Sequence, residues 1–133
     1  MAPKYPRRNA QPFTETRWCE VAYSALGVPT LNEGQPEVEG AASGGTGQLL
    51  ITFARGANRL EKLNVTVISA NPLGVPIPKA FPIAAGGSAA AVDADLQSNS
   101  PTLMIGFENW TGVLTNPTSV TLRIEITVKT SSI

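Results

Sequence analysis

The chain has 133 residues, of which ten are Lys or Arg, ten are Asp or Glu, one is Cys and none is His. This length suits one domain with one core, and the balanced charge provides no overall field that would draw the chain to nucleic acid or to an anionic membrane. The lack of His and the single Cys exclude Ser-His-Asp and Cys-His catalytic sets, zinc sites built on His and Cys, and an intrachain disulfide.

Charged residues make up 15% of the chain, whereas about 25% is usual for a soluble domain. Part of the surface must therefore be covered by small, neutral or apolar side chains, which is common in proteins that pack against neighbours. The N-terminal sequence is basic but lacks the apolar stretch of a secretory signal, and no apolar run approaches the roughly 20 residues that span a bilayer. We therefore expect a chain that is made in a cytoplasm and stays soluble or assembles there.

Residues 1–12 are expected to form an extended arm, followed by a single domain over residues 13–133. Three prolines exclude a helix and a central strand from the arm, and it carries three cations and no acid. The prolines are Pro3, Pro6 and Pro12, and the cations are Lys4, Arg7 and Arg8. Tyr5 and Phe13 are apolar anchors that a solvated tail would not need. The arm is either a frayed terminus or a segment that becomes ordered against a partner.

The first half of the domain alternates strand-like and loop-like segments. FTETRWCEVAY (13–23) is rich in β-branched and aromatic residues and predicts the first strand. Residues 26–36, with Gly27 and Pro29, are expected to form turns. GAASGGTG (40–47) is expected to be a loop, because its glycines fix no conformation and it has little to bury. A phosphate-binding loop would need Gly-Lys-Ser/Thr before a helix, which this segment lacks.

Two further strands are predicted at 47–54 and 60–69, and the short link with Gly56 and Asn58 indicates a hairpin between them. Residues 71–83 contain four prolines and are expected to form an edge strand or a long surface loop with exposed Ile77 and Phe81.

In the second half, residues 89–96 are expected to form a small-residue strand, since their flanks leave no room for a helix of normal length. Strand 100–110 precedes a turn at 111–119, and SVTLRIEITVK (119–129) closes the chain with strict alternation. The expected fold is therefore all-β: an antiparallel β-sandwich or jelly roll of seven or eight short strands with an extended N-terminal arm.

Several residue types invite a chemical interpretation, and each has a plainer one that we favour. Cys19 is expected to be a buried apolar thiol rather than a nucleophile. Asp93 and Asp95 would share one strand face, but they supply too few oxygen ligands for calcium and are interpreted as solvated. Trp110 could stack on a sugar, although a structural tryptophan at a strand end is favoured. The tripeptides NVT (64–66) and NWT (109–111) match the glycosylation pattern by chance if no secretory signal is present.

The layout of arm, strands and closing strand resembles the small jelly-roll cement (decoration) proteins of tailed-phage capsids. The segments that carry the resemblance are MAPKYPRRNAQPF, GQLLITFA, LEKLNVTVIS, TLMIGFENW and SVTLRIEITVK. The resemblance implies a non-enzymatic structural protein on the capsid exterior that binds the major capsid protein and forms a dimer or trimer across symmetry axes. From the residues themselves we expect no cofactor, no metal and no membrane, and nucleic acid is not an expected partner.

An arm or loop commonly ties such a protein to its shell, so we expect contacts from the arm and from the proline-rich edge. The expected partner-binding residues are Lys4, Tyr5, Arg7, Arg8, Phe13, Ile77, Lys79 and Phe81. Two other functions stay open. One is a receptor- or carbohydrate-binding jelly roll of the spike or fibre type, with Trp110, Trp18 or Tyr23 as stacking platform. The other is a self-assembling coat protein.

Overall fold

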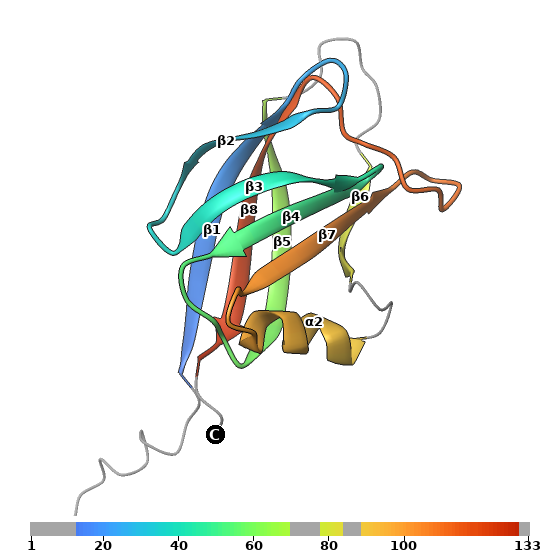
Figure 1. Cartoon of the computed structure of the whole chain (residues 1–133). Coiled ribbons are helices and arrows are strands. Elements are labelled where there is room, and N and C mark those ends of the chain that lie inside the picture. Colours follow the sequence, from blue (N-terminus) through green and yellow to red (C-terminus); the bar gives the residue numbers. More distant parts are fainter. Residues whose placement is uncertain (1–12, 70–77, 84–88, 131–133) are drawn as a thin grey trace, which may run out of the picture.

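A computed structural model of the chain describes residues 13–69, 78–83 and 89–130. Within these ranges two four-stranded antiparallel sheets pack together, which confirms the predicted all-β sandwich (Figure 1). The first sheet has the order β2-β1-β8-β5 and the second has the order β3-β4-β7-β6. None of the helical residues described forms a helix long and apolar enough to cross a membrane.

The strands of the first sheet are β1 (Thr14–Tyr23), β2 (Pro29–Gly34), β5 (Arg59–Ser69) and β8 (Val120–Lys129). Those of the second sheet are β3 (Val38–Gly45), β4 (Gln48–Phe53), β6 (Lys79–Ile83) and β7 (Thr102–Glu108). One helix, α2 (Ala89–Gln97), lies between β6 and β7 in the sequence.

The closing strand supplies the centre of the core. It pairs with β1 along its whole length, from Lys129 opposite Thr14 to Val120 opposite Tyr23. The predicted alternation is confirmed, because its apolar side chains are all buried: Val120, Leu122, Ile124, Ile126 and Val128. The second sheet faces them with Leu49, Ile51, Phe53, Leu103, Ile105 and Phe107. Cys19 is fully buried among these side chains, as predicted.

Two segments that were expected to be turns or loops pair as edge strands. Residues 29–34 form β2 on β1, and most of the small-residue stretch 40–47 belongs to β3, where Ala42 lies opposite Leu50 of β4. The loop prediction was wrong because an edge strand can be held by its backbone ladder without burying large side chains. Pro29 fits β2 because it is the first residue of that strand.

The predicted hairpin between β4 and β5 is also wrong, because these strands belong to different sheets. Residues 54–58 carry the chain from one sheet to the other. In this crossing the Ala57 N–H donates to the Leu96 carbonyl at 3.0 Å, and the Asn58 N–H donates to the Lys129 carbonyl at 2.7 Å. The crossing is therefore attached to both α2 and β8.

Arg17 of β1 fastens the same crossing from inside the sandwich. Its side chain is 1% exposed, and its guanidinium donates to the carbonyls of Arg55 at 2.9 Å and Gly56 at 3.0 Å. The guanidinium also pairs with Glu15 at 2.7 Å and lies 5.1 Å from the ring centroid of Phe53. A buried cation with these partners is fully satisfied.

Residues 89–97 form the helix α2, so the strand predicted at 89–96 is wrong. Alanine is the strongest helix former, and Val92 and Leu96 lie four residues apart, which places both on one helix face where they are buried. Asp93 and Asp95 therefore do not share a strand face. Asp93 accepts a hydrogen bond from the Leu60 N–H at 3.1 Å. The helix lies at the bottom of the sandwich in Figure 1.

The remaining predicted elements are confirmed within the described ranges. β6 pairs with β7 alone, so the described part of the proline-rich segment is an edge strand. Residues 111–119 turn the chain between β7 and β8.

Replacing Arg17 with methionine tests the crossing. Arg17→Met keeps an unbranched side chain but removes the charged donor of the Arg55 and Gly56 carbonyls and the ion pair with Glu15, so we expect the free energy of unfolding to fall by about 2–4 kcal/mol. Arg59→Met is the matched control, because Arg59 is 49% exposed in its pair with Glu61, and it should cost no more than about 0.5 kcal/mol. Urea unfolding measures both. Equal losses in the two variants would show that the buried guanidinium contributes nothing special.

The pH dependence of stability should report Cys19. Burial, with a smaller contribution from the charge of Glu20, raises the pKa of this thiol from 9.0 to about 11. The folded state disfavours the thiolate, so this stabilisation is fully present below pH 9.0 and is lost as the pH rises to about 11. We expect the free energy of unfolding to decline by up to about 3 kcal/mol over that range.

Burial also raises the pKa of Tyr23 above 10.0, which adds to the decline at the upper end. Urea titrations at several pH values measure the slope. Cys19→Val should flatten the slope, and an unchanged slope in this variant would contradict the assignment.

Candidate functional site

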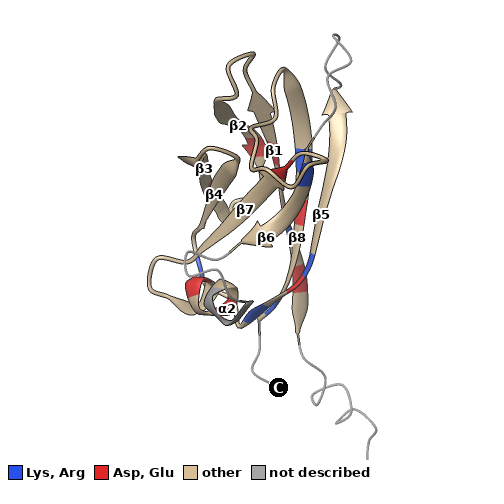
Figure 2. Ribbon diagram, turned by 90° about the vertical axis from the view of Figure 1, so that its right-hand side faces the viewer, with Lys and Arg blue, Asp and Glu red and all other residues tan. Residues whose placement is uncertain are grey.

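The two sheets differ in the charge that they carry, as the view in Figure 2 shows. In the first sheet β1, β5 and β8 contain three charged residues each. In the second sheet β3, β6 and β7 contain one each and β4 contains none. The strands of the second sheet therefore account for much of the low charge content of the chain.

The outer surface of the second sheet has no charged side chain over three successive cross-strand rows. We call these rows the neutral face. Inward-pointing residues of β4 and β7 are buried, so the residues between them point outward. The rows are Gly40, Thr52 and Thr102; Ala42, Leu50, Met104 and Ile83; and Gln48, Gly106 and Phe81. The middle row places an apolar side chain on each of the four strands.

Phe81 belongs to this face but is half-buried rather than exposed, which corrects the sequence prediction. Its ring lies across Gly106, its partner on β7, so closely that a Cβ at Gly106 would lie 2.8 Å from the Phe81 Cζ atom. Only glycine allows this contact, and the ring covers the backbone of β7 instead of extending toward solvent.

Of the other expected partner-binding residues the structure describes two, Lys79 and Phe13, and these two lie far apart. Lys79 is exposed at the start of β6. Phe13 is 68% exposed at the opposite end of the sandwich, where its carbonyl accepts the Thr130 N–H at 2.8 Å. The other five lie outside the described residues: Lys4, Tyr5, Arg7, Arg8 and Ile77.

The three aromatic residues that could act as stacking platforms have different environments. Tyr23 is 5% exposed and packs edge-to-face on Phe107, so it cannot serve. Trp18 is half-buried, and the Arg123 guanidinium lies 4.2 Å from its ring centroid. Trp110 is 91% exposed, so the interpretation of this residue as a structural tryptophan is wrong.

A tight turn holds Trp110 in this position. The Asn109 N–H donates to the Val113 carbonyl, and the Gly112 N–H donates to the Asn109 carbonyl, both at 2.9 Å. The Asn109 Oδ1 atom accepts hydrogen bonds from the Thr111 N–H, the Thr111 hydroxyl and the Val113 N–H, at 2.9, 2.6 and 3.1 Å. The indole is therefore displayed from a braced turn.

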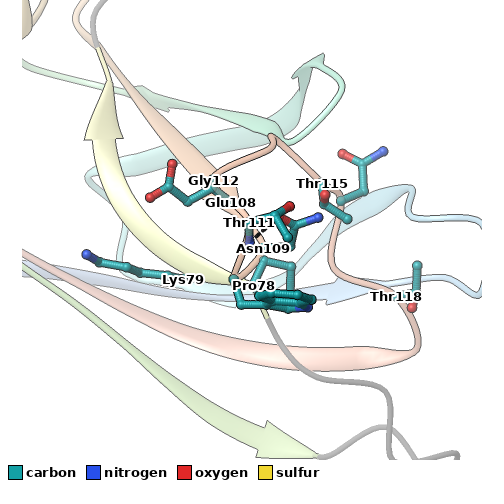
Figure 3. A pocket seen from close by; sticks show the side chains of 10 residues that line it. Pro78, Lys79, Glu108, Asn109, Thr111, Gly112, Thr115 and Thr118 are labelled. Carbon is teal, nitrogen blue, oxygen red and sulfur yellow. Dashed lines mark hydrogen bonds between the residues drawn. The ribbon is translucent and has the colours of Figure 1, made fainter.

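A pocket of about 890 Å³ lies beside this turn. Its walls come from the start of β6, the end of β7 and the segment that leads to β8. Figure 3 shows Lys79 and Glu108 at one end and Thr115 and Thr118 at the other. Trp110 and Asn116 also line the pocket.

Asn116 joins the pocket wall to two neighbouring turns. Its Oδ1 atom accepts the Gly47 N–H at 2.6 Å, and a Cβ at Gly27 would lie 2.8 Å from its own Cβ. The Ser119 N–H, three residues on, donates to the Ser24 carbonyl at 3.0 Å. These contacts fix the position of the wall relative to both sheets.

The described residues contain no group of three or more His, Cys, Asp or Glu side chains that could hold a metal ion. The side chains of both glycosylation-like asparagines take part in hydrogen bonds, Asn64 with Glu125 at 3.2 Å and Asn109 within its turn. No family model matches this chain, and no curated protein or solved structure matches it significantly.

The sequence analysis did not find the neutral face. The signal was present, because QLLITF and TLMIGF contain no charged residue, so neither side of these strands carries a charge. The pairing of the two strands, however, could not be deduced from their patterns. The sequence held no signal for the exposure of Trp110 beyond its place two residues before Gly112.

Gly47 offers a test of how the pocket wall is held. Its φ is 70°, and a Cβ there would lie 2.6 Å from the Thr115 N atom. Gly47→Ala should therefore lower the free energy of unfolding by at least about 2 kcal/mol through strain and steric overlap. Gly40→Ala is the matched control, because a Cβ there meets nothing within 4 Å, and it should change stability by less than about 1 kcal/mol. Thermal unfolding measures both, and a tolerated Gly47→Ala would contradict the close contact.

Proposed function

We propose that the chain is a capsid cement (decoration) protein, a non-enzymatic structural protein that binds the outer lattice of a virus shell. The observation that supports this proposal is the neutral face. Its three rows present Leu50, Met104 and Ile83 among small or uncharged side chains on four adjacent strands. Interface cores are depleted in charged residues in the same way.

The size of the face determines how it can be used. Four strands spaced about 4.8 Å apart, with about five residues each, cover roughly 300 Å². A stable interface buries about 800 Å² on each partner. The neutral face alone therefore gives a weak contact, which suits a protein bound side by side in many copies, because the lattice supplies a high effective concentration.

A second attachment would supply the rest of the affinity. The arm, residues 1–12, joins the domain at Phe13, next to Thr130. Twelve extended residues reach up to about 40 Å, which is enough to touch a shell subunit other than the one under the neutral face. Lys4, Arg7 and Arg8 can pair with shell carboxylates, and prolines reduce the entropy that the arm loses on docking. Such a molecule ties two subunits together and resists their separation.

A matched pair of threonine substitutions tests the neutral face. Thr52 on β4 and Thr121 on β8 are both half-buried, outward-facing residues of inner strands, one in each sheet. Thr52→Lys places a charge where the face would be desolvated, so we expect at least about tenfold less protein to sediment with native particles. Thr121→Lys should sediment like the unaltered protein.

The measurement is co-sedimentation of tagged protein with large particles from its native source, after unfolding curves show that both variants are folded. Loss of binding in Thr121→Lys but not in Thr52→Lys would show that the first sheet makes the contact and would contradict the role of the neutral face. Absence of the unaltered protein from the particle fraction would end the proposal.

Size-exclusion chromatography of the isolated chain distinguishes a cement protein from a coat protein. A coat protein should assemble into closed particles by itself. A cement protein should elute as a monomer or small oligomer. Deletion of residues 1–12 should weaken attachment to the particles, and unchanged attachment would remove the arm from the mechanism.

A further inference from the structure

We propose that the pocket beside Trp110 binds a neutral oligosaccharide, with the indole as the platform on which one pyranose ring stacks. The pocket begins just beyond the last row of the neutral face and shares no residue with that face, so this inference does not depend on the proposed function. It rests on the exposure of Trp110, the chemistry of the lining and the balance of charge.

Trp110 has the geometry of a binding platform. Its side chain is 91% exposed, yet the hydrogen bonds accepted by Asn109 brace the turn that carries it. A ligand that covers the indole therefore removes a large apolar surface from water without first having to order the turn. The C–H face of a pyranose ring is flat and apolar, and its rim carries hydroxyl groups, which suits an amphipathic aromatic side chain.

The rest of the lining can hydrogen-bond to hydroxyl groups. Thr115 and Asn116 present a hydroxyl and an amide group, which both donate and accept. The Thr115 hydroxyl donates to the Val113 carbonyl at 3.1 Å and keeps acceptor capacity. Asn116 uses its Oδ1 atom for Gly47, and its Nδ2 atom makes no hydrogen bond with the described residues, so it can donate to a ligand.

The balance of charge excludes other ligand classes. Lys79 and Glu108 are direct cross-strand partners, so the lining has one charge of each sign. Figure 3 shows both at the end of the pocket away from Thr115 and Thr118. A phosphorylated or sulfated ligand would require a positive site, usually with arginine, and none of the described residues that line the pocket is an arginine. A neutral polyol has no such requirement.

The volume indicates more than one sugar unit. Ligand pockets usually measure about 300–1,000 Å³, and this one, at about 890 Å³, lies in the upper part of that range. We therefore infer a short oligosaccharide that crosses the pocket from Trp110 toward Thr118.

The experiment titrates the full chain with four probes: maltotriose, cellotriose, chitotriose and lactose. Trp18→Phe leaves Trp110 as the single tryptophan, so its fluorescence reports the platform directly, and calorimetry gives the affinity of every variant. We expect at least one probe to shift the emission with a dissociation constant of about 1 mM or tighter. Trp110→Ala should weaken that affinity at least tenfold, about the effect of losing a central aromatic contact, and Trp110→Phe should recover part of it.

Unchanged unfolding curves are expected for Trp110→Ala, because the removed side chain is exposed, so a loss of binding cannot be attributed to misfolding. The proposal is overturned if none of the four sugars binds, or if Trp110→Ala binds as well as the unaltered chain. It is equally overturned if a heparin oligosaccharide, or a synthetic peptide of residues 1–12, shifts the Trp110 emission while the neutral sugars do not. The last result would show that the pocket receives the arm of another copy.

Discussion

The pairing of β1 with β8 is the constraint on which the rest of the structure depends. It joins the two ends of the domain in ten consecutive register pairs and places both strands at the centre of the first sheet. β8 alone contributes five buried apolar side chains to the core. Because β1 and β8 pair with each other, each has one further side to fill: β2 pairs with β1 and β5 pairs with β8, so β2 and β5 are the edge strands. The second sheet must then cover the apolar side of this pair, which fixes which of its own faces points outward.

The outer faces of the two sheets differ in how many of their side chains form ion pairs and hydrogen bonds with one another. On the first sheet Arg123 pairs with Glu20 at 3.3 Å and covers Trp18, while Glu125 accepts a hydrogen bond from Asn64. These cross-strand pairs stabilise the first sheet while its outer face stays in contact with water. The three rows of the neutral face contain no charged side chain, so removing water from them avoids the large cost of desolvating charges. The second sheet is therefore the one that a partner can cover at low cost.

The sequence could predict the strands that face a core on one side, because alternation is a local property, as in 119–129. It could not predict which strands pair, so 47–54 and 60–69 were assigned to a hairpin although Arg17, more than thirty positions away from the crossing that it binds, holds them in separate sheets. Glycine and alanine carried the other errors. In 40–47 they accompany an edge strand, and in 89–96 they accompany a helix, and only tertiary contacts decide between these outcomes. The exposure of Trp110 depends on a turn whose hydrogen bonds no pattern announces.

The two candidate binding regions meet at one cross-strand pair. Phe81 and Gly106 form the last row of the neutral face, and Lys79 and Glu108 follow on the same two strands. Opposite charges at this boundary form a polar rim for the face and at the same time one end of the pocket. Burying either charge would be costly, so a partner on the neutral face gains by stopping before this pair. The two proposals are therefore compatible, because a partner that covers the neutral face leaves the pocket open to solvent.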